Sequence, residues 1–244
     1  NNMAADYFYE ISESLPQIEA LAESDLFRKR ELASLVAAKI HFHLDSSDNA
    51  LRYALGAGSL FDVSTDSSEF GIAMLTKCVD EYSKARQNPK SAVAIDRRLE
   101  AVVEALFQRS LASGQFKTAI GAAVDCRRLD IIERAAASGG ASALEYCKRL
   151  ALGGNVAETT TVGAAVPTNS HASEIQQLPR QFRAEMLRLL ERLYRAQPHE
   201  TVDYPSLVQC LSWLDDATAV AQVIYDLTAS DSSDAQLMAY QVAF

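Results

Sequence analysis

The chain has 244 residues, of which 48% are hydrophobic and 23% are charged, and this is enough for one large globular domain or two small ones. Its formal net charge of -9 argues against nucleic acid and anionic membranes as main partners, because both bind basic surfaces. No stretch is both long and apolar enough to span a bilayer, and the first ten residues lack the basic and apolar regions of a secretory signal.

The sequence favours helix throughout. There are only 6 prolines and 10 glycines, and the apolar residues recur at helical spacing in almost every segment. No alternating strand pattern with a hairpin turn is present. We therefore predict an all-α fold, in which short connections join roughly ten to twelve helices as antiparallel neighbours.

The first strong helical pattern covers residues 30–44, "RELASLVAAKIHFHL". It predicts a core stripe of Leu32, Leu35, Val36 and Ile40. His41 and His43 lie in the same helix. Residues two positions apart in a helix are rotated by roughly 200°, so the two rings point to nearly opposite sides. His171 and His199 lie in a loop and at a helix end, and no Cys-x-x-Cys or His-x-x-x-His spacing occurs. We predict no metal site.

The second pattern covers residues 50–63, "ALRYALGAGSLFDV", where a helix meets two glycines. A dinucleotide-binding loop needs a third glycine and lies at the start of a helix, whereas Gly56 and Gly58 come at the end of a helix. The sequence also contains no Walker motif. We predict no nucleotide cofactor. Ala54 and Ala57 instead allow a neighbouring helix to approach closely, and Gly56 or Gly58 can end the helix in the left-handed conformation.

Residues 119–132, "AIGAAVDCRRLDII", match this stretch at an offset of 69 residues. Ala50 aligns with Ala119, and Ala54 with Ala123. The offset fits two repeat units of roughly 35 residues, and residues 216–227 resemble a third, weaker copy. Chance similarity between alanine-rich helices is the alternative. If the repeat is real, each unit is a hairpin of two antiparallel helices, and the hairpins stack into an α-solenoid rod.

Two further helices have clear core stripes and ends. Residues 96–114 end at Gly114, residues 181–196 are followed by Pro198, and Gly139-Gly140 separates two more helices. The predicted stripes are Leu99, Val102, Val103, Leu106, Phe107 and Leu111 in the first helix, and Phe182, Met186, Leu189, Leu190, Leu193 and Tyr194 in the second.

Residues 153–174 break the helical pattern, because they are rich in Gly, Thr, Ser and Ala and lack a large aromatic residue. We expect a mobile loop inside one domain that covers residues 1–244.

The remaining chemically notable residues have ordinary structural explanations. Asp215-Asp216 lies between two helices, which is the usual place of an acidic N-cap. Nothing in the sequence indicates that Asp130 and Glu133 face a common cleft, as acid-base catalysis would require. Arg127-Arg128 lies at a helix joint, where a structural role is favoured over an interface. The four cysteines, Cys78, Cys126, Cys147 and Cys210, are scattered within apolar helical patterns, which indicates reduced thiols and a cytosolic or nuclear protein. No catalytic, cofactor or metal residue is predicted, and protein-binding residues are not identified.

Several stretches together resemble one family, the N-terminal region of the largest non-ATPase subunit in the base of the proteasome regulatory particle. They are residues 35–44, 51–63, 76–82, 95–133, 208–224 and 237–244, in the family's order. The resemblance implies a non-enzymatic scaffold that holds lid and base together, contacts helical-repeat subunits of the lid, and is found in cytoplasm and nucleus. In the family, a toroid of repeats and a C-terminal tail follow this rod. Neither is recognised here, so the chain is expected to be an excised domain.

Two other functions are considered beside the scaffold. A tetratricopeptide-like adaptor predicts repeated Asn, Lys or Arg residues that clamp a peptide in a concave groove, and the sequence shows no such repetition. An α/α-barrel hydrolase predicts two acids that face one cavity.

Overall fold

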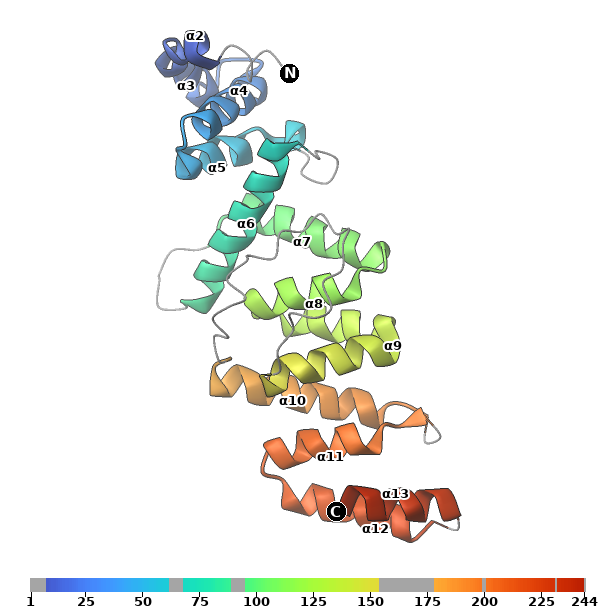
Figure 1. Cartoon of the computed structure of the whole chain (residues 1–244). Coiled ribbons are helices and arrows are strands. Elements are labelled where there is room, and N and C mark those ends of the chain that lie inside the picture. Colours follow the sequence, from blue (N-terminus) through green and yellow to red (C-terminus); the bar gives the residue numbers. More distant parts are fainter. Residues whose placement is uncertain are drawn as a thin grey trace. The chain divides into compact units, whose positions relative to one another are not determined.

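The computed structural model describes residues 8–61, 68–88, 95–153, 178–198, 201–230 and 232–243. Over these ranges all regular secondary structure is helical, with twelve α-helices, one short 3-10 helix (η1) and no strand (Figure 1). This confirms the predicted all-α fold. The described residues up to 118 form one compact unit and those from 119 onward form another, so each unit is described by itself.

In the first unit each helix packs mainly on its neighbours in the chain. α3 packs on α4, α4 on α5, α5 on α6, and α6 on α7. The largest side chains that are fully buried here come from three of these helices, and they include Ile40, Met74, Tyr82 and Phe107. The elements are α2 (Phe8–Ser12), α3 (Leu15–Glu23), α4 (Arg30–His43), α5 (Ser47–Gly56), η1 (Gly58–Leu60), α6 (Glu69–Gln87) and α7 (Arg97–Ala112).

The second unit shows the same nearest-neighbour packing. α9 packs on α10, α10 on α11, α11 on α12, and α12 on α13 (Figure 1). Such sequential stacking of helices is typical of an α-helical repeat solenoid. The elements are α8 (Phe116–Asp125, whose first three residues belong to the first unit), α9 (Leu129–Leu152), α10 (Arg180–Arg195), α11 (Tyr204–Trp213), α12 (Ala217–Thr228) and α13 (Ser233–Ala243).

Four helix joints share one backbone geometry. One residue with positive φ stands two positions before the next helix, namely Asp45 (60°), Gly114 (72°), Arg127 (51°) and Asp215 (59°). The following amide reaches back to the carbonyl five residues earlier, as in Ser46 N to His41 O at 2.9 Å and Arg128 N to Ala123 O at 2.8 Å. This is the Schellman motif, which satisfies the last carbonyls of one helix and turns the chain directly into the next.

The joints support the predicted repeat at an offset of 69 residues. Asp45 and Gly114 precede helices of ten residues each, and Gly58 (φ 54°) and Arg127 (φ 51°) follow them at the same spacing. The aligned alanines Ala54 and Ala123 are both inaccessible to solvent. The recurrence of positive φ at both ends favours a true repeat over chance similarity, although Gly58 leads into η1 and Arg127 leads into α9. The third copy begins with the same joint at Asp215, but the helix that follows is largely exposed.

Small residues line the contact between α4 and α5. Ala37 and Ala38 on α4, and Ala50 and Ala54 on α5, have no exposed surface. A Cβ added at Gly56 would lie 3.2 Å from Ser34 Oγ, closer than ordinary packing allows. The "GAG" stretch therefore ends α5 and brings two helices together, as predicted.

The predicted core stripes are confirmed with one exception. In α7 and α10 every predicted stripe residue is buried or half-buried, and Leu187 of α10 is buried in addition. In α4 the prediction for Leu32 was wrong, since 44% of this residue is exposed. It lies in the first turn of the helix, where it lines an open pocket together with Leu60.

Backbone breaks fall at the predicted glycines. Gly114 takes the left-handed conformation after α7, and Gly140 has φ 62° and ψ -154°, which divides α9 into two helical segments. Gly153 is the left-handed C-cap of α9, and the rest of the expected loop at 153–174 lies outside the described residues. In the part of the chain that the structure describes, no helix has the length and hydropathy needed to cross a membrane.

Candidate interaction surfaces

The residues that sequence reasoning singled out do not gather at one site. Arg128 Nη2 pairs with Asp130 Oδ2 at 2.7 Å, and Glu133 pairs with Arg192 of α10 at 3.7 Å. The Arg128 guanidinium lowers the pKa of Asp130, which keeps this carboxylate charged at the start of α9. Two acids held by different arginines do not form the carboxylate pair of a hydrolase.

The paired acids between α11 and α12 serve the helix joint. Asp215 takes the left-handed conformation, and the Asp216 carboxylate accepts hydrogen bonds from Thr218 Oγ1 at 2.7 Å and Ala219 N at 3.0 Å. These bonds lower the pKa of Asp216. Asp216 is thus the N-cap of α12, as predicted.

The two histidines of α4 have different surroundings, which agrees with their predicted separation around the helix. His41 is buried, whereas His43 is exposed. His171 and His199 lie outside the described residues. Among the residues that are described, no three His, Cys, Asp or Glu side chains are placed to share a metal ion.

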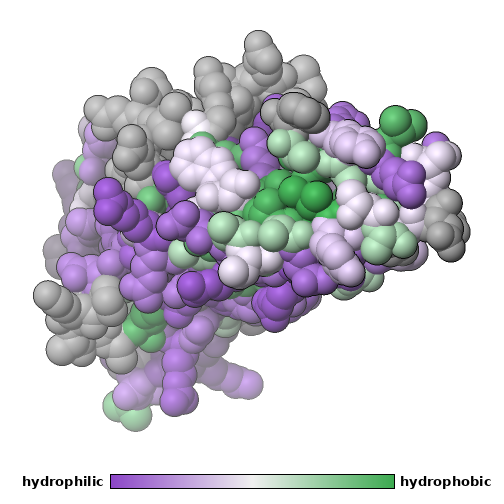
Figure 2. All heavy atoms as spheres, turned by 90° about the horizontal axis from the view of Figure 1, so that it is seen from below, coloured by the Kyte–Doolittle hydropathy of each residue, from purple (hydrophilic) through white to green (hydrophobic). Residues whose placement is uncertain are grey.

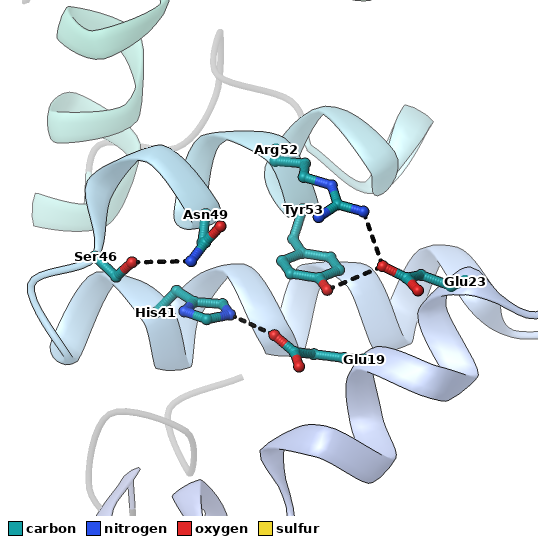
Figure 3. Close-up of polar contacts among 7 residues, drawn as sticks. All are labelled: Glu19, Glu23, His41, Ser46, Asn49, Arg52 and Tyr53. Atoms are coloured by element: carbon teal, nitrogen blue, oxygen red, sulfur yellow. Dashed lines mark hydrogen bonds and ion pairs between the residues drawn. The ribbon is translucent and has the colours of Figure 1, made fainter.

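His41 belongs to a polar cluster that joins α3, α4 and α5 (Figure 3). Its Nε2 lies 2.8 Å from Glu19 Oε1, and its ring stacks on Tyr53 at a centroid distance of 5.4 Å. The Tyr53 hydroxyl donates to Glu23 Oε1 at 3.3 Å, and Arg52 Nη2 donates to the same oxygen at 2.9 Å. Burial, followed by the charges of Glu19 and Glu23, raises the pKa of Tyr53 to about 12.

This cluster has a structural explanation. No residue of α3 is fully buried, so its position depends on half-buried apolar contacts and on these polar bonds. Glu19 and Glu23 are four residues apart on α3 and therefore lie on one side of it. That spacing is the one sequence signal of the cluster, and it does not reveal partners 22 and 30 residues away.

The four cysteines are buried and form no disulfide among the described residues, which agrees with the reduced thiols predicted. Burial raises the pKa of Cys78 and of Cys147 to about 12, and that of Cys210 to about 11. Since the thiolate is the reactive form, these thiols are poor nucleophiles near neutral pH.

A thiol-reactive dye tests this placement. In buffer near neutral pH, we expect all four cysteines to react slowly and together, at the rate of unfolding. In guanidinium chloride, all four should react at the rate of a free thiol. Rapid modification of even one cysteine in the native chain would show that its helix is less well packed than described.

The hairpin of α12 and α13 carries an exposed apolar surface. Tyr225, Leu237 and Tyr240 are each more than 60% exposed, and Ala217 and Ala221 of α12 are also exposed. Figure 2, which views the molecule from the side of this hairpin, shows apolar side chains gathered on this face. The inner side of α12 has only two buried residues, Val223 and Leu227. A contiguous exposed apolar surface of this kind is typical of a protein interface.

Comparison with known proteins identifies the family. The N-terminal domain of 26S proteasome subunit RPN2 matches residues 1–244. The chain belongs to this family. The RPN2 N-terminal domain thus accounts for the whole of the sequence, including residues that the structure does not describe.

Curated relatives in animals, plants and fungi agree with this assignment. The 26S proteasome non-ATPase regulatory subunit 1 of Drosophila melanogaster is 38% identical to this chain over 248 residues. The protein of Arabidopsis thaliana named 26S proteasome non-ATPase regulatory subunit 1 homolog A is 36% identical over 251 residues. The regulatory subunit rpn2 of Schizosaccharomyces pombe is 31% identical over 240 residues. The alignments cover 96–100% of this chain but 22% of each relative, so the chain spans about a fifth of their length.

Proposed function

We propose that the chain is a non-catalytic scaffold domain of the proteasome regulatory particle, which mediates contacts between lid and base during ubiquitin-dependent protein degradation. The observation that carries this proposal is the family match over residues 1–244, because the matched relatives are named as non-ATPase regulatory subunits. Within each unit, the nearest-neighbour stacking of helices supports a mechanical role, since solenoids present long surfaces to partners. No cofactor or metal is part of the proposal.

The proposal includes the organisation of the chain. Residues 1–244 would act as one helical-repeat rod domain in cytoplasm and nucleus, with residues 153–174 as a loop within it. Small-angle X-ray scattering tests the rod. We expect a radius of gyration well above about 18 Å, the size of a compact sphere of this length. A value near that of the sphere would contradict the rod.

The exposed hairpin of α12 and α13 gives the scaffold proposal a physical basis, because covering its apolar surface with a partner makes the free energy of binding more favourable. The partners are other regulatory-particle subunits, among them the helical-repeat subunits of the lid.

A retention assay with purified regulatory-particle subunits tests the scaffold. The immobilised chain, with and without residues 153–174, is expected to retain at least one helical-repeat subunit of the lid. The double variant Leu237→Lys/Tyr240→Lys should weaken retention about 10-fold or more, because two charges would enter an apolar contact. The control Gln222→Lys/Gln241→Lys adds the same charge at exposed polar positions of the same hairpin. Retention of no subunit, or equal loss in both variants, would count against the scaffold surface.

A further inference from the structure

A second surface lies in the first unit, where the connection between α3 and α4 meets η1. A pocket of about 460 Å³ opens here, and we call it the Leu60 notch. Its volume falls within the usual range for binding sites. The residues that line it are Asp25, Phe27, Arg28, Lys29, Arg30, Glu31, Leu32 and Leu60.

Exposed leucines stand among the charged residues that form most of the lining of the notch. Leu26 is 97% exposed beside it, and the lining residues Leu32 and Leu60 are 44% and 48% exposed. Two backbone turns hold the connecting loop, with Phe27 N bonded to Ser24 O at 3.2 Å and Arg30 N to Phe27 O at 3.1 Å. The leucines are thus displayed by ordered backbone, which lowers the entropy cost of binding a partner.

The notch also carries a local excess of positive charge. Arg28, Lys29 and Arg30 are consecutive and exposed. Arg30 pairs with Asp25, whereas no ion pair of Arg28 or Lys29 occurs among the described residues. Glu31 is directed toward the backbone at Gly58, where an added Cβ would lie 3.2 Å from its Oε1. Two basic side chains therefore remain for an external partner, on a chain whose net charge is -9.

We propose that the Leu60 notch binds an acidic, amphipathic segment of a partner protein. An apolar side chain of that segment enters the notch between Leu32 and Leu60, and flanking carboxylates pair with Arg28 and Lys29. Charge complementarity selects the acidic segment, and the leucines select a protein over a polyphosphate. A nucleic acid would gain little from the apolar rim and would be repelled by the acidic remainder of the chain. This inference is independent of the scaffold role.

Fluorescence polarisation with a designed probe tests the proposal on the full 244-residue chain. The probe is a labelled peptide that has two adjacent leucines between runs of aspartate and glutamate. Two matched peptides replace the leucines with serine, or the acids with lysine. We expect the probe to bind at least about 10-fold more tightly than either, and its affinity to fall as salt is raised from about 50 to 500 mM. Equal binding of the three peptides, or none, would overturn the proposal.

Surface variants locate the binding. Arg28→Glu/Lys29→Glu and Leu26→Ser/Leu60→Ser are each expected to weaken probe binding about 10-fold. The control Arg97→Glu/Arg188→Glu makes the same change of net charge at exposed arginines that do not line the notch, and should leave binding unchanged. All changed residues are at least partly exposed, and circular dichroism checks that each variant is folded. Equal weakening by the control, or tighter binding of single-stranded DNA than of the probe, would overturn the assignment.

Discussion

Replacement of Ala54 by leucine should destabilise the first unit by about 1–3 kcal/mol, the usual cost of forcing extra methylene groups into a packed core. Ala54 has no exposed surface, and it lies on α5, which packs against α4 through small residues. A larger side chain must push the two helices apart or leave its preferred rotamer.

Urea denaturation followed by far-UV circular dichroism measures the effect of Ala54→Leu. The matched control is Ala105→Leu, at an exposed position of α7 in the same unit. The control should change the free energy of unfolding by no more than about 0.5 kcal/mol. If both variants unfold at the midpoint of the parent, Ala54 is not at a tight contact, and the explanation of the small residues is wrong.

Truncation of Leu190 to alanine is expected to cost more, about 2–5 kcal/mol of the stability of the second unit. Leu190 is fully buried in α10, the helix that packs against both α9 and α11. Its loss removes buried apolar surface and leaves a cavity in the core of the second unit. Because each helix of a solenoid depends on its neighbours, the effect should extend to α9 and α11.

Hydrogen exchange of backbone amides tests both parts of this prediction. Leu190→Ala should increase exchange in α9, α10 and α11. The matched truncation Leu237→Ala, at a residue that is 66% exposed on α13, should change exchange only locally. Comparable destabilisation by the two truncations would mean that the α13 surface is part of the core, which would also remove it as an interface.

Much of the fold follows from local sequence patterns. The helical stripes of α7 and α10 depend on spacing within one helix, so a single sequence reveals them. The breaks at Gly114 and Gly140 follow from the freedom of glycine to adopt positive φ. Asp45, Arg127 and Asp215 adopt the same conformation without that advantage, so residue type alone does not reveal these turns.

The candidate surfaces were much harder to predict. The helical period placed Leu32 on the core stripe, because periodicity gives a direction around the helix but not where a neighbouring helix ends. The apolar residues of α12 likewise suggest burial, yet only Val223 and Leu227 are buried, although the helix packs against α11 and α13. Exposure is decided by which helices are present around a given turn, and no local pattern contains that information.

By itself, the sequence determined the helical class, the repeat, the joints at glycine and the family, because each depends on spacing or on residue identity along the chain. The tertiary structure decided that His41 is held by Glu19 and Tyr53, that Arg128 pairs with Asp130, and that Leu32 and Leu60 line one notch. The physical reason is that ion pairs, stacking and exposure are set by distances between segments, and these distances exist only after the helices have packed.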